Sequence, residues 1–343
     1  MSAQGGPLGV VLGDRGLFVR ALDLWLDPTG VPPVGPETAA FVSHAHAAAS
    51  ATRSRALASP ETIALSEALG WTFSQAHPMA WGETIPWAIG SRYGGGTAHL
   101  SIAHAGHVLG GSQLVIDHPR GRLVYTGDWS SEPDATRPPG EAVACDELVI
   151  TSAFGLPIFR FRPMQRVAAD IGGWCAARLA EDCTPFVLVQ TPGPAQSLAH
   201  ALANRGLAVV ADAQVLRACT AYETIGAPIG VVGDCAGPRR GAVVLTRADS
   251  PVAERQAPKR HAVAYASGWA GLDAALAQKK ADAGFVFADL ADFDRWLALV
   301  SSTGASSVYV TRGQARPLAH ELRRRGVNAD ALALGPIDDR GSS

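Results

Sequence analysis

Two histidines placed two residues apart are the first sign of chemistry in the chain. His44 and His46 follow directly on the apolar stretch 39–42, which predicts a strand. Side chains at positions i and i+2 of an extended segment point the same way, so the two imidazoles can converge on one metal ion. The same spacing also suits two surface histidines, so this pair alone does not decide between the two interpretations.

Other residues of the types that bind or orient metal ions also follow predicted strands. His107 lies in a glycine-containing turn after the strand predicted over 100–103. Asp128 follows the strand predicted over 123–125, and Asp27, at another strand end, is expected to orient a ligating histidine or to accept hydrogen bonds from backbone amides. Chance placement of all these residues at strand ends is improbable, so the pattern favours a metal site.

The elements that must position these side chains change in kind along the chain. The first 130 residues contain short apolar runs broken by glycine and proline, which predict strands, and 60–69 predicts a helix with Ser59 as its N-cap. From about residue 145, apolar strands alternate with amphipathic helices, which is typical of βαβ units with a parallel sheet. The predicted strands there are 148–150, 186–189, 208–209, 242–245, 284–287 and 307–310, and the predicted helices are 165–179, 195–204, 293–301 and 317–325.

The composition is that of a globular protein of about two domains. Of 343 residues, 47% are hydrophobic and 17% charged, and the net charge is −2, so no overall basic field attracts nucleic acid. The five cysteines are odd in number and show no CxxC spacing, which favours a reducing cytoplasm. The N-terminus lacks a signal-peptide pattern, and no apolar run of about 18 residues predicts a membrane span.

The order of the polar motifs resembles the metallo-β-lactamase fold, in its nucleic-acid-processing β-CASP branch. Asp27 is followed by the HxH pair, then by AGHVLG over 105–110 and by TGD over 126–128. The runs FGLPIF over 154–159 and ASGW over 266–269 are similar to the bacterial ligase-associated DNA exonucleases and to mRNA 3′-end processing exonuclease-like proteins. The similarity covers about residues 15–330.

This resemblance implies an architecture in the α/β class. An αββα sandwich of the metallo-β-lactamase type is expected over 1–152 and 284–335, with an inserted β-CASP-like α/β cap over 153–283 and a tail over 336–343. In the family, the HxH histidines and the AGH histidine hold one zinc ion, and the TGD aspartate bridges this ion to a second one. The resemblance therefore implies that the metal ligands of this chain are His44, His46, His107 and Asp128.

The chain departs from the family pattern at every ligand that belongs to the second metal ion alone, and at other site positions. The substituted positions are Ala48 and Ala49, where the family has a metal-binding Asp and His, Thr151, where it has an acidic residue, and Leu290 and Arg312, where it has histidines. The resemblance therefore implies one zinc ion at most, with an empty site as the alternative.

These losses undermine phosphodiester hydrolysis, because two-metal enzymes use both ions to stabilise the attacking and leaving oxygens. The favoured hypothesis is a degenerate exonuclease relative, a pseudoenzyme that binds DNA, RNA, a DNA ligase or another repair protein. One alternative is a working mono-zinc hydrolase, a nuclease or small-ester hydrolase, with Asp128 and Asp27 as the catalytic carboxylates. Another alternative is a metal-free scaffold.

Two arginines, Arg160 and Arg162, alternate with Phe159 and Phe161. This alternation suits single-stranded nucleic acid, which is bound by stacking and charge. It also suits an ordinary amphipathic edge strand, and the sequence leaves both interpretations open.

Overall fold

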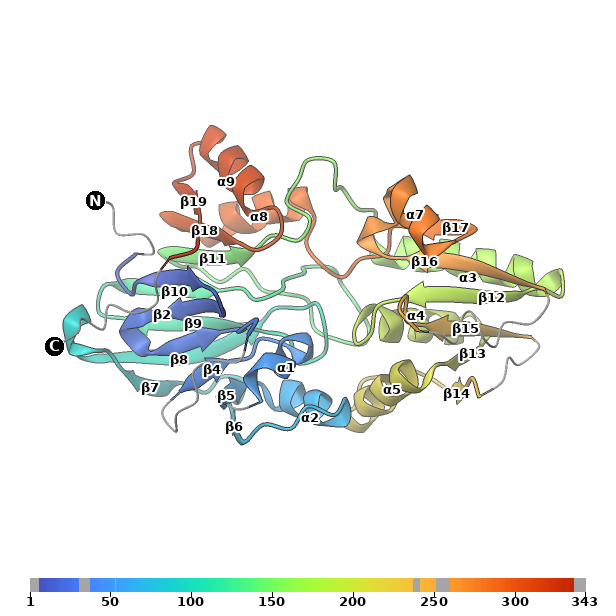
Figure 1. Ribbon diagram of the computed structural model, residues 1–343, viewed down its shortest axis with the longest axis horizontal. Helices are drawn as coiled ribbons and strands as arrows, with labels where there is room; N and C mark the ends of the chain where they lie inside the picture. The colour runs from blue at the N-terminus through green and yellow to red at the C-terminus, as the bar shows by residue number, and fades with distance from the viewer. Residues whose placement is uncertain (1–5, 31–37, 53, 237–240, 251–259, 336–343) are drawn as a thin grey trace. The chain divides into compact units, whose positions relative to one another are not determined.

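A computed structural model of the protein describes residues 6–30, 38–52, 54–236, 241–250 and 260–335. The chain forms two compact units (Figure 1). The first unit comprises 1–131, 139–159 and 290–343, and the second comprises 132–138 and 160–289. Both units combine sheets with helices, so the predicted α/β class is confirmed. The predicted tail 336–343 lies outside the described residues.

The first unit begins with a six-stranded sheet in the order β1-β2-β3-β4-β5-β6. The pairs from β1 to β3 are antiparallel, and those from β3 to β6 are parallel. The carboxyl ends of β3 and β4, which precede Asp27 and His44, therefore lie at the same edge. The strands are β1 (Val10–Gly13), β2 (Gly16–Val19), β3 (Leu24–Leu26), β4 (Ala39–Phe41), β5 (Arg55–Ala58) and β6 (Gln75–Pro78).

The second sheet of this unit has seven strands in the order β19-β18-β11-β10-β9-β8-β7. β10, β11, β18 and β19 are parallel, whereas β7 to β10 are antiparallel. The parallel part places Asp128, Thr151 and Arg312 at one edge. The strands are β7 (Ile85–Ala88), β8 (Thr97–His104), β9 (Ser112–His118), β10 (Gly121–Tyr125), β11 (Glu147–Thr151), β18 (Ser307–Thr311) and β19 (Ala329–Ala331).

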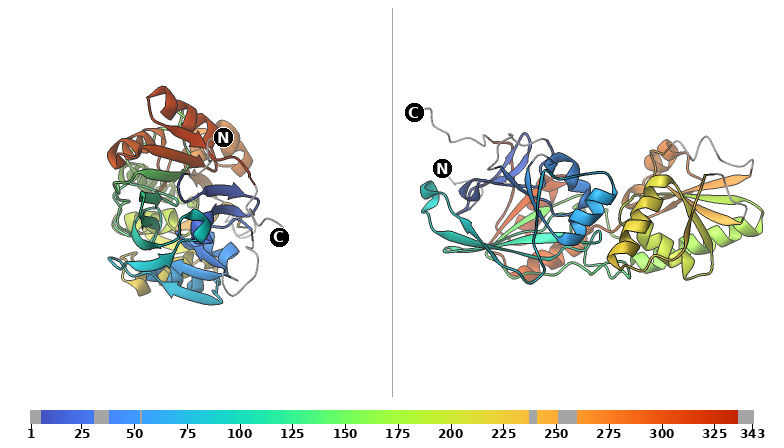
Figure 2. Two further views of the ribbon diagram at one scale, coloured as in Figure 1. Left: turned by 90° about the vertical axis from the view of Figure 1, so that its left-hand side faces the viewer. Right: turned by 90° about the horizontal axis from the view of Figure 1, so that it is seen from below.

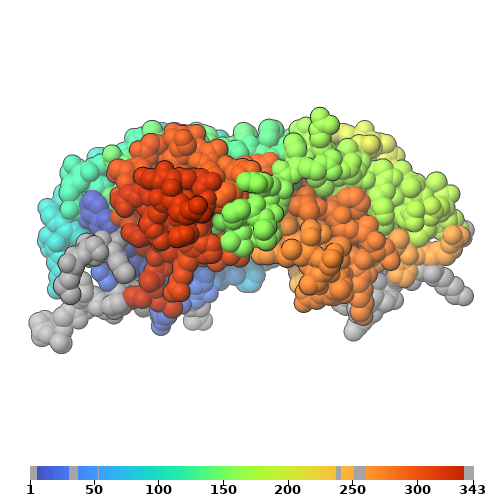
Figure 3. Space-filling model, turned by 90° about the horizontal axis from the view of Figure 1, so that it is seen from above, coloured from blue at the N-terminus to red at the C-terminus, as the bar shows by residue number. Residues whose placement is uncertain are grey.

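The two sheets pack face to face around one hydrophobic core. Phe41 from the first sheet and Tyr125 from the second meet edge to face, with ring centroids 6.5 Å apart. Helices α1 and α2 cover the outer face of the first sheet, and α8 and α9 cover that of the second. Figure 3 shows the C-terminal segment with these last two helices, in red, on one outer face of the unit.

The helices of the first unit are short, and side-chain caps fix where two of them begin. Ser59 Oγ accepts from the Thr62 N–H at 3.1 Å at the start of α2, and Asp292 caps α8 through the Arg295 N–H at 3.0 Å. The helices are α1 (Ala48–Ala51), α2 (Pro60–Ala68), α8 (Phe293–Thr303) and α9 (Ala315–Arg324), with 3-10 turns η1 (Arg20–Leu22), η2 (Ala45–Ala47) and η3 (Ser91–Tyr93).

The second unit is built on a parallel sheet in the order β14-β13-β15-β12-β16-β17, with helices beside it (Figure 2). The predicted βαβ pattern is confirmed here. The strands are β12 (Thr184–Val189), β13 (Ala208–Ala211), β14 (Val232–Asp234), β15 (Ala242–Thr246), β16 (His261–Ala266) and β17 (Ala283–Phe285). The helices are α3 (Met164–Ala180), α4 (Pro194–Ala203), α5 (Ala213–Ile225), α7 (Asp273–Lys279) and the 3-10 turn η4 (Gly268–Gly271).

Two local expectations differ from the structure. The segment 160–162 is not a strand but irregular chain before α3, where Arg162 pairs with Asp170 at 2.8 Å, so the edge-strand interpretation is wrong. The strand expected at 284–287 is β17, which pairs with β16 and so belongs to the second unit, and the chain returns to the first unit at Leu290. Among the helices of the described residues, none is long and apolar enough to cross a membrane.

Glu147, at the start of β11, is expected to make stability depend on pH. Burial raises the pKa of its carboxyl group from 4.5 to about 7, although Arg120 opposes the shift. A carboxyl whose pKa is higher in the folded chain stabilises the fold below the unfolded pKa, and this stability is lost as the pH rises through the folded value. Glu147→Gln is therefore expected to raise the free energy of unfolding at pH 8 by roughly 1–2 kcal/mol and to change it little at pH 4.5.

Urea unfolding at the two pH values measures this difference. Glu67→Gln, at an exposed position of α2, serves as the control and is expected to have no such pH-dependent effect. An equal change in stability for Glu147→Gln at both pH values would show that the carboxyl group titrates normally.

Candidate metal centre

The segment after β4 carries two of the three histidines of the centre. Ser43 and His44 continue the strand direction, and His44 has an extended backbone with φ −164° and ψ 166°. The chain then turns into η2, which contains His46. This change from extended to helical backbone keeps the two imidazoles close, with ring centroids 5.3 Å apart and nearly perpendicular planes.

The third histidine, His107, lies in the loop between β8 and β9, which is anchored to the start of α2. The carbonyl oxygen of Gly110 accepts from Ser59 Oγ at 2.6 Å and from Thr62 Oγ1 at 2.9 Å. A Cβ atom at Gly110 would lie 2.6 Å from the Thr62 nitrogen, so only glycine allows this approach. The glycine-containing turn thus holds His107 rigidly against the HxH segment.

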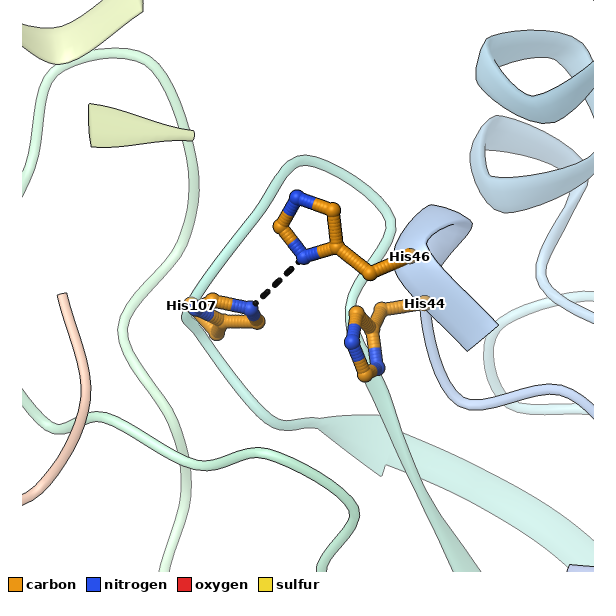
Figure 4. A group of neighbouring side chains, drawn as sticks. All are labelled: His44, His46 and His107. Carbon is orange, nitrogen blue, oxygen red and sulfur yellow. Dashed lines mark hydrogen bonds between the residues drawn. The ribbon is translucent and has the colours of Figure 1, made fainter. Parts of the chain in front are cut away.

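The three imidazoles gather around one point (Figure 4). One nitrogen from each ring can be chosen so that all three lie within 4.8 Å of one another, and His46 Nδ1 lies 3.2 Å from His107 Nε2. In a tetrahedral zinc site with Zn–N bonds of about 2.05 Å, neighbouring ligand atoms are separated by about 3.3 Å. His44, His46 and His107 thus form a group that could bind a metal ion.

Ser43 determines which nitrogen of His44 is available to a metal ion. Its hydroxyl donates to Asp27 Oδ2 at 2.5 Å and lies 2.7 Å from His44 Nδ1. Because the single hydroxyl proton goes to the carboxylate, we assign the proton of the second hydrogen bond to His44 Nδ1. His44 Nε2 is then a lone pair facing the centre, as a metal ligand requires.

Asp27 accepts several of the hydrogen bonds that support the histidines. Its side chain is buried and accepts from the Ser43 N–H at 2.7 Å, from the Ser43 hydroxyl and from the Tyr125 hydroxyl at 2.8 Å. Its carbonyl oxygen accepts from Arg312. Asp27 thus reaches His44 through Ser43, rather than touching the ring itself.

Asp128 lies beside two of the histidines. Its Oδ2 is 3.6 Å from His44 Nε2 and 3.9 Å from His107 Nε2, and its Oδ1 accepts from Thr151 Oγ1 at 2.9 Å. Burial alone would raise the pKa of Asp128, but His44, His107, Arg312 and the Thr151 hydrogen bond together lower it to about 2. Burial lowers the pKa of His44, so a neutral ring and an ionised carboxylate face the same point.

Arg312 turns into this region from the end of β18. Its guanidinium hydrogen bond goes to the main-chain oxygen of Asp27 and not to the Asp128 carboxylate that its charge would suit. Its charge nevertheless acts on both Asp128 and His44, lowering the pKa of each. The guanidinium is therefore a fixed positive charge inside the centre.

The other positions that the resemblance marks as substituted carry few groups that could bind a metal ion. Ala48 is fully buried in the core beneath the first sheet, and Ala49 follows it in α1. Thr151 supplies a hydroxyl that donates to the Gly127 carbonyl or to Asp128. Leu290 is half-buried and precedes Ala291, whose N–H donates to the Trp129 carbonyl at 2.8 Å.

Three residues of the centre have left-handed backbone. The φ angles of Asp27, His107 and Arg312 are 41°, 61° and 58°. Residues other than glycine adopt this conformation at a cost of about 1–2 kcal/mol, and such strain is often found at functional sites. The surrounding hydrogen bonds therefore hold these side chains in place against the backbone preference.

Sequence analysis did not identify the supporting roles of Ser43, Tyr125 and Thr62, and it identified Ser59 only as the cap of α2. Ser43 stands directly before the HxH pair, and Tyr125 stands directly before the TGD motif, so their positions next to site motifs were the only available signal. Their partners are up to 98 residues away along the chain, as with Tyr125 and Asp27. Only the folded chain shows these pairs.

Ser43→Ala is expected to lower metal affinity about 10- to 100-fold, as is usual when a group that orients a ligating histidine is lost. The change leaves His44 Nδ1 without its acceptor and allows the other tautomer. Titration of the metal-free protein with Co²⁺, followed by absorbance, measures the effect. Ser112→Ala is the control, because this buried hydroxyl lies 3.3 Å from the Ser43 carbonyl but takes no part in the Asp27–His44 link. Equal affinities for the two variants would contradict the assigned role.

Comparison with known proteins gives one informative similarity. No family model matches the chain. Over 321 residues, the chain is 29% identical to a protein of Opitutus terrae named "Probable DNA ligase". The matched region covers 93% of this chain but 30% of the relative, so the chain spans about a third of the length of that protein.

Proposed function

We propose that the chain is a degenerate member of the β-CASP branch of the metallo-β-lactamase fold. It holds at most one zinc ion and binds nucleic acid or a DNA-repair partner, with little or no phosphodiesterase activity. The observation that carries this proposal is the gathering of His44, His46 and His107 beside Asp128, next to a fixed positive charge from Arg312.

The donor set fits one zinc ion. Three imidazole nitrogens and one carboxylate oxygen are a chemically suitable set of ligands for a tetrahedral zinc ion. A second divalent ion would have only Asp128 to share, would gain no ligand from Ala48, whose methyl group packs in the core, and would be repelled by Arg312. A bound zinc ion would supply Lewis-acid chemistry, while the chain's own residues bind and orient it.

The same features argue against efficient hydrolysis of a phosphodiester. Leu290 cannot donate a hydrogen bond to a phosphate or protonate a leaving group, and Ala48 cannot orient an attacking water. An enzyme that loses several catalytic groups that act together retains little catalytic activity, because the contributions of these groups to the rate are not additive. Binding without cleavage is the function that this residue set supports best.

The domain assignment forms part of the proposal. The first unit, with two packed sheets and helices on both outer faces, corresponds to the metallo-β-lactamase-like domain. The second unit, with its parallel sheet, corresponds to the β-CASP-like cap. The similarity to the "Probable DNA ligase" over nearly the whole chain supports an association with DNA, with a ligase or another repair protein as the partner.

The test combines metal analysis with substrate assays. The purified protein, stripped with chelator and reloaded, is expected to retain one zinc ion per chain. It is expected to shift labelled single- or double-stranded DNA or RNA without cleaving it, in the presence of Zn²⁺ or Mn²⁺. Two ions per chain would contradict the proposal. Cleavage that disappears in Asp128→Asn would indicate a mono-zinc hydrolase, and nucleic-acid binding without any metal would indicate a scaffold.

A further inference from the structure

Three side chains of the metal centre, two of them charged, are partly exposed. His46 and Arg312 are half-buried, and the side chain of Asp128 is 25% exposed. Arg312 has five N–H donors, and its hydrogen bond within the described residues goes to the Asp27 carbonyl. Donors therefore remain for a ligand that enters from solvent.

We propose that Arg312 and a single metal ion at His44, His46, His107 and Asp128 together bind a phosphate monoester, which would join these ligands on the ion. This inference rests on the proposed single-metal site and names the ligand of that site. Arg312 takes the electrostatic place of a second cation, and because its charge is permanent it does so without metal chemistry.

The charges around Arg312 explain why the metal ion and the arginine must act together. Burial lowers the pKa of Arg312, but Tyr125, Asp27 and Asp128 raise it, so the guanidinium and the two carboxylates act on one another electrostatically. Without an ion, two carboxylates outweigh one guanidinium and the centre repels anions. A bound divalent ion reverses the sign, so the loaded centre attracts an anion and the ion-free centre does not.

A phosphate monoester fits this centre better than a phosphodiester. A terminal phosphate carries close to two negative charges near neutral pH, against one for an internal diester, and so gains more from the reversed charge. A guanidinium can also bind two oxygens of one phosphate in a bidentate manner. Such a group occurs as inorganic phosphate and at the ends of nucleic-acid strands.

The competing explanation is that Arg312 only ties the end of β18 to β3 through the Asp27 carbonyl. That role would need the hydrogen bond but no ligand. Arg312→Gln keeps an amide donor and removes the charge, so it separates the two roles. Arg316→Gln, an exposed arginine near the start of α9, makes the same charge change outside the centre and serves as the control.

The experiment measures binding of inorganic phosphate by calorimetry to zinc-loaded protein freed of unbound ion. We expect binding by the wild type and by Arg316→Gln, at least about tenfold weaker binding by Arg312→Gln, and loss of binding after chelation. Metal content is expected to be unchanged in Arg312→Gln. Oligonucleotides with a 5′-phosphate, a 3′-phosphate or neither then identify the source of the phosphate group.

The outcomes separate this inference from the proposed function. Equal phosphate affinity for wild type and Arg312→Gln, or no phosphate binding by the zinc-loaded wild type, overturns the inference alone. A protein that takes up no metal ion overturns the single-metal site instead. If Arg312→Gln fails to fold, Arg312→Met replaces it: this variant removes both the charge and the N–H donors and is expected to bind phosphate at least about tenfold more weakly, and unchanged affinity would again overturn the inference.

Discussion

Replacement of His46 with alanine is expected to weaken metal binding by on the order of 100-fold or more. A structural zinc site with four ligands gains roughly 10–16 kcal/mol, so each ligand accounts for several kcal/mol. His46 lies in η2 with its Nδ1 3.2 Å from His107 Nε2 and has ordinary backbone geometry, so alanine removes the ligand with little effect on the fold. Calorimetric titration with Zn²⁺ and the visible absorbance of bound Co²⁺ measure the loss.

The matched control is His104→Ala. His104 ends β8 and stacks on Trp81, with ring centroids 4.0 Å apart, and does not belong to the group that could hold a metal ion. This variant is expected to bind metal with the affinity of the wild type. If His46→Ala also retained that affinity, the three histidines would not form the metal site.

Asp27→Ala is expected to lower the free energy of unfolding by about 3 kcal/mol or more. The change leaves the buried Ser43 N–H and the Tyr125 hydroxyl without their acceptor, and each unsatisfied group costs about 1–3 kcal/mol. It also removes the support of His44 through Ser43, so metal affinity should fall in parallel. Urea unfolding of the metal-free and metal-loaded protein measures both effects.

Asp23→Ala is the control for the backbone. Asp23 has a φ of 49°, close to the 41° of Asp27, but its side chain is exposed. The two variants therefore share the cost of alanine in left-handed backbone, and their difference reports the hydrogen bonds of Asp27. A loss of stability as large in Asp23→Ala would show that the backbone, and not the hydrogen bonds of Asp27, is responsible.

Much of the candidate site could be anticipated from local patterns. The HxH pair after an apolar run, the glycine-containing turn with His107 and the TGD motif are each readable within a few residues. Parallel strands bring their carboxyl ends to one edge, so residues after such strands are expected to meet. The structure brings the three histidines together and places Asp128 beside them. Whether they hold zinc stays a prediction.

The direction in which Arg312 points was not readable from sequence. The opposite charges of Arg312 and Asp128 would suit a guanidinium–carboxylate pair, but the guanidinium hydrogen bond goes to the Asp27 carbonyl, 285 positions away along the chain. Asp128 instead accepts from Thr151 and faces two histidines. A local pattern contains no information on which of two acceptors the packing of β18 against its neighbours brings nearer.

Several elements with strong local signals were predicted, although α5 (Ala213–Ile225), which Asp212 caps, was missed along with strands that depend on a partner. The helix predicted over 165–179 is α3 (Met164–Ala180), because its apolar residues recur at helical spacing. In contrast, β6 ends at Pro78 and β7 contains Pro86, and a proline inside a run argues against a strand. Both form the edges of their sheets, where a missing N–H is tolerated.

The sequence by itself determined the α/β class and the strand ends that carry the histidines. These features depend on residue type and on spacing over a few positions, which side-chain periodicity and ligand chemistry translate directly into structure. Only the tertiary structure decided that Ser43 links Asp27 to His44 and that Arg312 binds the Asp27 carbonyl. Both depend on the register and packing of strands far apart in the chain, and that geometry arises only when the two sheets come together around their common core.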